Sequence, residues 1–369
     1  MSARYFVVKS CIPFTLAILL FGLACFPARA AFTSLYVFGD SLSCTTNNPS
    51  AGPLYYGQRY ANGRVWVEVL AQRQGVATNA ILNNSYFGNY SSNVLKTVKT
   101  FNATDTNTAL VVVWANNADL FDLPLYTVTD LATWTNSISQ STNNYYQIIT
   151  NLYGKGFRTL IMPNVVDLST IPRFNHSSGN YTNTVHQQCL AYNAAFAKTI
   201  GWARTNYPDL KLYSPDFYAL LANLFANPAE YGVTNATINW GSVVASVDAI
   251  TKLETPALST GPGTNFNFWD QFNPTAIVHA IMADVAQQLL SPVQFSGLAQ
   301  VNASNRLDVV NMPVGTANNF VLYATNLAQP VWLTNSSFAG ITNPQSIFVS
   351  PTNSQRFYRL KFPWQWSWP

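Results

Sequence analysis

The chain has 369 residues, and only 9% of them are Asp, Glu, Lys or Arg, against about 25% in typical globular proteins. The formal net charge is +4. Three of the basic residues fall within the first 30 positions, which hold no acid, so the rest of the chain has 16 basic and 15 acidic residues. A nearly neutral surface gives no electrostatic basis for binding nucleic acid or anionic membranes, and we expect neither as a partner.

The first 30 residues have the pattern of a secretory signal peptide. Arg4 and Lys9 form a basic start, residues 12–26 form an apolar run, and Ala28-Arg29-Ala30 gives a small-x-small cleavage signal. The apolar run is short for a membrane-spanning helix, and no later segment has enough consecutive apolar residues to span a bilayer. We therefore expect an exported mature chain that begins near Ala31 and is periplasmic, extracellular or attached to the cell surface.

Short apolar runs alternate with helical patterns through most of the mature chain. The sequence predicts strands at 34–38, 109–114, 159–163 and 210–214, each buried on both faces, and helices at 63–75, 130–153, 184–204 and 275–290. This alternation is typical of a parallel sheet covered by helices on both sides. Ligands bind such sheets beyond the carboxyl ends of the strands.

The pattern changes after Pro292. Residues 295–362 contain no convincing helix, and short apolar runs are separated by Asn, Gly and Pro, which predicts a small all-β module. We expect three parts: the signal peptide at 1–30, an α/β domain at 31–292 and the β-rich module at 293–369. The module ends in Trp364, Trp366 and Trp368, which form a binding strip for a sugar or partner, close the base of the module, or belong to a frayed tail.

Cys44 and Cys189 are the cysteines of the expected mature chain. An oxidising compartment allows them to form a disulfide, but a chain of this length can bury a sufficient core without one. The sequence leaves this pairing open.

The segment YVFGDSL places Ser41 directly after the first predicted strand. A serine there lies at the carboxyl edge of the sheet, where its hydroxyl faces the ligand crevice and its backbone N–H can help to form an oxyanion hole. Gly-Asp-Ser also forms ordinary turns, so this motif alone does not identify a nucleophile.

Five ordered segments resemble the conserved blocks of the SGNH/GDSL esterases and lipases, in their secreted lipolytic branch. Beside the Ser41 motif they are YYGQRYANGRVWVEVLAQRQG (55–75), NNSYFG (83–88), VVVWANNADLF (111–121), IMPNVVDLSTIP (161–172) and FWDQFNPTAIVH (268–279). The resemblance covers residues 34–290. It implies a three-layer α/β sandwich with a flavodoxin-like central parallel sheet. It also implies hydrolysis of a small-molecule ester, a lipid or an acylated carbohydrate, without a metal or cofactor.

Transferred by position, the resemblance makes Ser41 the nucleophile, Gly88 and the Ser41 N–H oxyanion donors, and Asp270 the residue that orients the catalytic base. In the third block, a match without gaps places Asn116 at the family's glycine and Ala118 at its oxyanion asparagine. Asn116 and Asn117 remain candidate oxyanion donors if the loop follows a different path.

Asn273 stands at the position of the family's catalytic histidine. An uncharged amide has no useful basicity near neutral pH, so it cannot accept the serine proton. Where a serine and its base act as a unit, removal of one lowers the rate by on the order of 10⁶-fold in the best-studied case. An oxyanion hole and substrate binding alone retain roughly 10³-fold acceleration over water.

Three histidines and one thiol are alternatives for the missing function. His176, in a polar loop after the fourth predicted strand, is a candidate relocated base. His279 matches the family's second histidine and is expected to be a structural hydrogen-bonding residue, and His186 is expected to be a surface or capping residue. Cys44 is an alternative nucleophile, but its thiol also needs a base or a lowered pKa.

The sequence therefore supports a GDSL-type serine ester hydrolase with an impaired base. The alternatives are a catalytically silent relative that binds an acylated sugar or lipid, and a purely structural exported protein.

Overall fold

The computed structural model describes residues 32–49, 52–175, 179–234, 237–240, 243–253, 265–302, 304–312, 319–340, 344–350 and 356–361. The expected signal peptide, His176 and the three tryptophans of the tail lie outside these residues. The chain divides into two compact units between Leu290 and Ser291, two residues before the boundary expected from the sequence.

The larger unit is built on a sheet of five parallel strands in the order β2-β1-β3-β4-β5. This is the flavodoxin-like order, so the fold class expected from the sequence is confirmed. The strands are β1 (Leu35–Gly39), β2 (Ile81–Asn83), β3 (Leu110–Trp114), β4 (Thr159–Ile161) and β5 (Lys211–Tyr213).

The three central strands are apolar because both of their faces are covered. Every residue of β1, β3 and β4 is buried, as the sequence predicted. The same prediction was wrong for β5, in which Lys211 is exposed and Tyr213 is half-buried. β5 is an edge strand, so it lacks a neighbour on one side.

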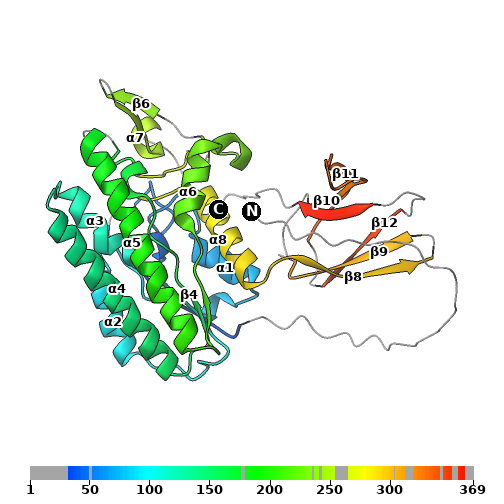
Figure 1. The fold of residues 1–369 in the computed structure, drawn as a ribbon, viewed down its shortest axis with the longest axis horizontal. Helices are drawn as coiled ribbons and strands as arrows, with labels where there is room; N and C mark the ends of the chain where they lie inside the picture. Colours follow the sequence, from blue (N-terminus) through cyan, green and yellow to red (C-terminus); the bar gives the residue numbers. More distant parts are fainter. Residues whose placement is uncertain are drawn as a thin grey trace. The chain divides into compact units, whose positions relative to one another are not determined.

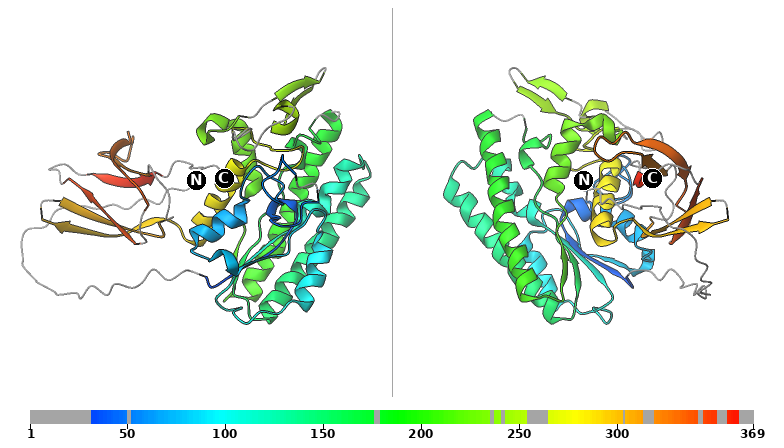
Figure 2. Two further views of the ribbon diagram at one scale, coloured as in Figure 1. Left: turned by 180° about the vertical axis from the view of Figure 1, so that it is seen from behind. Right: turned by 45° about the vertical axis from the view of Figure 1, so that its right-hand side comes forward.

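Helices cover both faces of this sheet, and Figures 1 and 2 show α2, α4 and α5 on one face and α1 and α8 on the other. The sequence predicted α1, α4, α5 and α8, and all four are confirmed with shifts of a few residues at their ends. The helices are α1 (Trp66–Arg73), α2 (Ser91–Thr100), α3 (Asn116–Leu125), α4 (Leu131–Gly154), α5 (Gly179–Asn206), α6 (Phe217–Ala226), α7 (Ala249–Leu253) and α8 (Ala276–Leu290).

Short elements complete the larger unit. Four 3₁₀ helices are η1 (Ser41–Ser43), η2 (Thr78–Ala80), η3 (Leu168–Thr170) and η4 (Pro228–Tyr231). An antiparallel pair, β6 (Thr237–Trp240) and β7 (Val243–Ser246), precedes α7.

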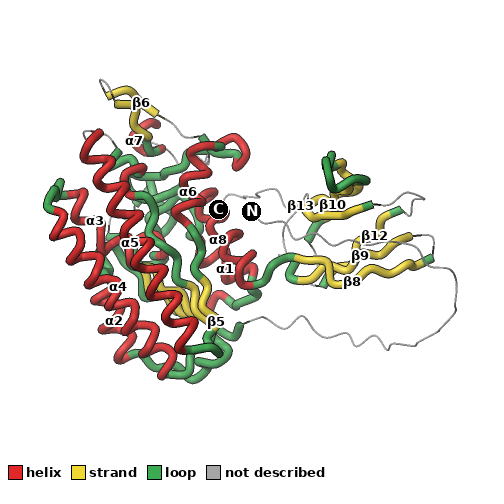
Figure 3. Tube along the Cα trace, in the orientation of Figure 1, coloured by secondary structure: helices red, strands yellow, loops and turns green. Residues whose placement is uncertain are grey.

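The regular elements described in the smaller unit are all strands, joined by loops, as Figure 3 shows, which agrees with the expected all-β module. Its sheets have the orders β11-β10-β13 and β12-β9-β8, with neighbouring strands antiparallel. The strands are β8 (Gln294–Val301), β9 (Ser304–Val310), β10 (Asn319–Ala324), β11 (Leu333–Phe338), β12 (Gln345–Val349) and β13 (Phe357–Lys361).

Both small sheets contribute to one hydrophobic core. Val309 and Ile347 of one sheet and Val321 of the other belong to the same buried cluster, which Met312 completes at one end. A separate core of this kind is what allows a short β module to be a compact unit.

Candidate active site

Ser41 lies directly beyond the carboxyl end of β1, as the sequence predicted. Asp40 is the N-cap residue of η1, and its Oδ1 accepts a hydrogen bond of 3.0 Å from the Leu42 N–H. Gly39 allows this turn, because a Cβ at position 39 would lie 3.0 Å from the Cβ of Ser43. The Gly-Asp-Ser sequence therefore holds the serine at the edge of the sheet in two ways. Gly39 leaves room for the Ser43 side chain, and Asp40 caps the turn through its hydrogen bond from the Leu42 N–H.

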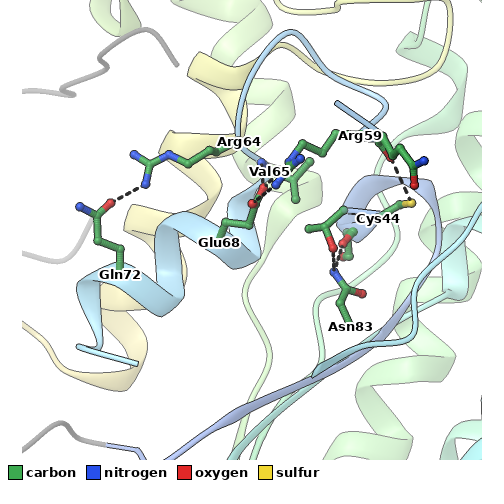
Figure 4. A network of polar contacts seen from close by, with 10 residues as sticks. Cys44, Arg59, Arg64, Val65, Glu68, Gln72 and Asn83 are labelled. Atoms are coloured by element: carbon green, nitrogen blue, oxygen red, sulfur yellow. Dashed lines mark hydrogen bonds and ion pairs between the residues drawn. The ribbon is translucent and has the colours of Figure 1, made fainter. Parts of the chain in front are cut away.

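The loop that follows Ser41 is fixed by a network of polar contacts (Figure 4). The Asn83 amide of β2 donates to the Ser43 carbonyl oxygen at 2.7 Å. Arg59, farther along the loop, forms a two-pronged ion pair with Glu68 of α1, and the Glu68 carboxylate also accepts from the Val65 N–H at 3.0 Å. These contacts connect the serine turn to β2 and α1, so the position of Ser41 depends on the main body of the sheet.

Ser41 lines a cleft with an empty volume of about 720 Å³, which includes its open mouth. The lining residues are Asp40, Ser41, Leu42, Phe87, Gly88, Tyr90, Asn117, Ala118, Phe121, Asp122, Val166, Leu168, Ile171, Leu221, Phe268, Phe272, Pro274 and Met282. They come from the segments that follow β1, β2, β3 and β4, from α6, and from α8 and the segment before it. Most of these side chains are apolar, which is typical of a small-molecule site with a few oriented polar groups.

Two backbone N–H groups are available at this cleft. Within the described residues, neither the Ser41 N–H nor the Gly88 N–H has a hydrogen-bond acceptor. Gly88 has a φ of +74°, in the left-handed region that favours glycine. Free N–H groups at a cleft beside a serine hydroxyl are the arrangement that an oxyanion hole requires.

Asn116 and Asn117 are adjacent in the chain, but only Asn117 lines the cleft. The Asn116 side chain is fully buried, donates from Nδ2 to the Pro163 carbonyl oxygen at 2.9 Å and does not line the cleft. Asn117 lines the cleft, and its Oδ1 accepts from the Val166 N–H at 3.0 Å while its Nδ2 lies 3.4 Å from Asp40 Oδ2. Ala118 also lines the cleft but has no side-chain donor. Of the two candidate donors, the structure brings Asn117 to the cleft and keeps Asn116 away from it.

Asp40 is a buried carboxyl group next to Ser41. Burial raises its pKa to about 7, although hydrogen bonds from the Leu42 N–H, the Asn117 amide and the Ala118 N–H act in the opposite direction. Its charge therefore changes near neutral pH, and the hydrogen bond that it accepts from Asn117 strengthens when it ionises.

Asp270 and Asn273 are paired behind the cleft. Asn273 Nδ2 lies 3.0 and 3.1 Å from the two carboxylate oxygens of Asp270, and the Tyr55 hydroxyl donates to Asp270 Oδ2 at 3.0 Å. Phe272 and Pro274, which flank Asn273, line the cleft, whereas Asp270 and Asn273 are not among its lining residues. Asn273 Oδ1 is buried and has no hydrogen-bond partner in the described structure. The segment that carries the base position thus reaches the cleft, but the Asn273 amide is directed toward Asp270.

The two described histidines do not line the cleft. His279 is buried in α8, which lowers its pKa to about 3, and its Nδ1 has no partner. The expectation that His279 is a structural hydrogen-bonding residue is thus not supported at Nδ1. His186 contacts Asp167 Oδ2 through Nδ1 at 2.6 Å and lies 3.1 Å from the Tyr218 hydroxyl, so it is a paired residue and not a helix cap. His176, the candidate relocated base, is outside the described residues.

Cys44 and Cys189 are both buried free thiols. Burial raises the pKa of each thiol, and a thiol without a lowered pKa is a poor nucleophile at neutral pH. The environment of Cys44 therefore does not favour its use as an alternative nucleophile.

Sequence reasoning missed two tyrosines of this region. Tyr55 contacts Asp270 across 215 positions of the chain, and Tyr90 lines the cleft, where its hydroxyl donates to Asp122. Neither pairing has a local sequence signal, because each depends on how distant loops meet.

The described residues contain no cluster of His, Cys, Asp and Glu suited to a metal ion. Their helices also include none with the length and apolar character needed to span a membrane.

The chain is similar to curated plant proteins. It is 28% identical over 167 residues to the Arabidopsis thaliana protein GDSL esterase/lipase At1g71691, an alignment that covers 43% of this chain and 43% of the relative. It is also 28% identical over 152 residues to GDSL esterase/lipase At5g03810 of the same plant, covering 38% and 41%. The chain thus spans about two fifths of the length of these relatives.

Among solved structures, a lipase from a goat rumen metagenome, Lip_vut3, aligns at 13% identity and a TM-score of 0.42, covering 70% of this chain and 97% of that one. The acetylxylan esterase Axe2 from Geobacillus stearothermophilus aligns at 12% identity and a TM-score of 0.39, covering 71% and 94%. The family model for GDSL-like lipases and acylhydrolases matches residues 35–286, which is well over half of the chain. The chain therefore belongs to the GDSL-like lipase/acylhydrolase family.

Proposed function

We propose that this protein is an exported GDSL-type ester hydrolase in which Ser41 is the nucleophile and the general base is impaired. The observation that carries the proposal is the cleft itself, which Ser41 and Gly88 both line and where neither backbone N–H has an acceptor among the described residues. Family membership supports the same reaction class. Export is proposed from the pattern of the first 30 residues.

In the proposed reaction, Ser41 Oγ attacks the ester carbonyl carbon and its proton passes to a general base, which later returns it to the leaving alcohol. The carbonyl oxygen becomes an oxyanion. The N–H groups of Ser41 and Gly88 stabilise that oxyanion. Its collapse breaks the bond to the alcohol, which leaves with a proton, and an acyl group remains on Ser41. Water then attacks this acyl-enzyme, releasing the acid and restoring the serine hydroxyl.

The base of this reaction is the deficient component. Asn273 cannot accept the serine proton, His279 is buried away from the cleft and His186 is engaged by Asp167. His176 stays a proposed relocated base, because the described segment before it contacts the site. In that segment Ile171 lines the cleft, and Phe174 packs with its ring centroid 6.3 Å from that of Phe272.

A catalytically silent binding protein is the second candidate. It is favoured by the side chain of Asn273, which is held by Asp270 in the way that an imidazole would be held but offers no basic nitrogen. In that function the same apolar cleft binds an acylated sugar or lipid without hydrolysing it.

Hydrolysis of p-nitrophenyl butyrate by the purified mature protein separates the two candidates. The ester hydrolase is expected to show slow turnover that Ser41→Ala abolishes and that His176→Ala reduces only if His176 is the base. Turnover that is indistinguishable from the uncatalysed rate would instead support the silent protein. Turnover unchanged by Ser41→Ala would exclude the serine mechanism.

A further inference from the structure

Three phenylalanine rings form one wall of the Ser41 cleft. Phe87 follows β2, Phe121 lies on α3 and Phe272 precedes α8, and all three line the cleft. The Phe121 ring meets the other two edge to face, with centroid distances of 5.7 Å to Phe87 and 5.0 Å to Phe272. Phe87 is 46% exposed, so its ring remains accessible to a ligand. Aromatic rings prefer edge-to-face or offset contacts with another ring, so this wall is suited to a planar aromatic group.

Tyr90 and Asp122 place a polar pair in the same cleft. The Tyr90 hydroxyl donates to Asp122 Oδ2 at 2.7 Å, and this hydrogen bond is the largest cause that raises the pKa of Tyr90 to about 12. The second carboxylate oxygen, Oδ1, has no donor among the described residues. The cleft therefore offers a fixed acceptor for one ligand hydroxyl group.

The other polar side chains of the cleft have little capacity left for a ligand. Asp40 accepts from Leu42 and Asn117, and Asn117 also accepts from the Val166 N–H. A sugar ring has several hydroxyl groups, most of which would meet apolar side chains here and lose their hydrogen bonds to water. A ligand with one hydroxyl group on an aromatic ring avoids this cost.

Helix α3 connects the Ser41 end of the cleft to Asp122. The Ala118 N–H donates to Asp40, directly beside Ser41. Asp122 follows one helical turn later, about 6 Å farther along the axis. Ser41 and Asp122 therefore lie in one cleft and are connected through a single turn of α3.

We propose that the substrate of this cleft is an ester of a hydroxylated aromatic acid. Its ring packs on Phe121 and its hydroxyl group donates to Asp122 Oδ1, while its carbonyl group lies at Ser41. The position of the carbonyl group rests on the proposed function, whereas recognition of the ring and its hydroxyl group does not require turnover.

The test measures binding of two matched probes, methyl 4-hydroxybenzoate and methyl 4-methoxybenzoate, by titration calorimetry in the Ser41→Ala background, which prevents hydrolysis. The methoxy probe has the same ring but cannot donate a hydrogen bond. We expect the hydroxy probe to bind about tenfold more tightly, because only this probe can donate a hydrogen bond to Asp122 Oδ1. Asp122→Asn should reduce this preference to threefold or less, and the control Asp209→Asn, whose carboxylate does not line the cleft, should leave it unchanged.

Equal affinity for the two probes, or no binding of either, would overturn the inference. So would a preference that survives Asp122→Asn. The proposed esterase function is tested separately, by measuring p-nitrophenyl butyrate turnover of the protein with Ser41 intact. A protein that prefers the hydroxy probe but hydrolyses no ester would therefore support this inference and contradict the proposed function.

Discussion

Asn273 donates its side-chain amide to both oxygens of Asp270, at 3.0 and 3.1 Å. Asp270 also accepts from the Phe272 and Asn273 N–H groups and from Tyr55, so its carboxylate is held by several donors although it is buried. In the proposed mechanism Asp270 is the carboxylate of the dyad, and these contacts hold it firmly. The same mechanism requires a basic nitrogen beside this carboxylate, and Asn273 offers an amide there instead.

Gly88→Ala is expected to lower residual ester hydrolysis about tenfold. The residue has a φ of +74°, and a Cβ there would meet no atom within 4 Å, so the substitution acts through backbone strain and not through a clash. Left-handed backbone costs a non-glycine residue roughly 1–2 kcal/mol, and relief of that strain would move the N–H away from the oxyanion. The measurement is kcat for p-nitrophenyl butyrate.

Gly232→Ala is the matched control for that variant. Gly232 has a φ of +67°, is equally free of neighbours and does not line the cleft. We expect both variants to lose similar stability and only Gly88→Ala to lose activity. An equal loss of activity in the two variants would mean that Gly88 has no specific role at the oxyanion.

Asn62→Ala is expected to destabilise the larger unit by about 1–2 kcal/mol, the usual effect of losing a helix cap. The fully buried Asn62 accepts from the Ala276 N–H at 2.8 Å through its Oδ1, and Ala276 is the first residue of α8. The change in the free energy of unfolding is measured with a chemical denaturant. Asn102→Ala, at an exposed position, should change it by less than about 0.5 kcal/mol.

The stability of the protein is expected to fall as the pH rises from 5 to 8. Burial raises the pKa of Asp40 to about 7 and the pKa of Asp119 and Asp270 to about 6. An acid whose pKa is raised by folding holds its proton more tightly in the folded state, so its contribution is present at low pH and is lost as the pH rises through the folded pKa. The Tm should therefore be several degrees higher at pH 5 than at pH 8.

His279 has the opposite effect on the pH dependence of stability, and its effect lies at lower pH. Burial lowers its pKa to about 3, so the stability gained by keeping it neutral is lost as the pH falls from about 6.5 to about 3. Asp40→Asn should flatten the decline between pH 5 and 8, and His279→Leu should flatten the loss below pH 5. A Tm that rises steadily from pH 5 to 8 would contradict this assignment of buried groups.

Cys44 and Cys189 are expected to resist thiol reagents in the folded protein. Both are buried and unpaired, and burial raises the pKa of each thiol, which leaves little thiolate to react. Ellman's reagent should label both cysteines in denaturant but neither in buffer, and a reducing agent should leave the Tm unchanged. A Tm lowered by the reducing agent would indicate a disulfide.

The sequence predicted the central strands well because β1, β3 and β4 are continuous apolar runs that only a sheet covered on both faces can bury. It missed β2, in which Ile81 and Asn83 are half-buried and Leu82 is exposed, and it placed β5 in the interior although that strand lies at the edge. Edge strands carry weak hydrophobic patterns because one side lacks a neighbour.

The sequence predicted only part of the candidate site. Ser41 directly follows β1, so its position in the chain was sufficient to place it at the carboxyl edge of the sheet. Gly88 follows β2, a strand that the sequence did not predict, and only the family resemblance assigned it to the site. The different roles of Asn116 and Asn117 depend on one turn of the loop that begins α3, and the contacts of Tyr55 and Tyr90 depend on how distant loops meet. No local pattern contains that information.

The most direct test of the account is the kcat of Asn273→His for p-nitrophenyl butyrate, measured beside the double variant Ser41→Ala/Asn273→His. Asp270 is already positioned to orient an imidazole, and a general base contributes roughly 10²–10⁴-fold. We expect the single variant to exceed the native rate by about 10² or more and the double variant to lose that gain. A correctly folded Asn273→His protein with no gain, or a gain that persists without Ser41, would contradict a serine site that lacks only its base.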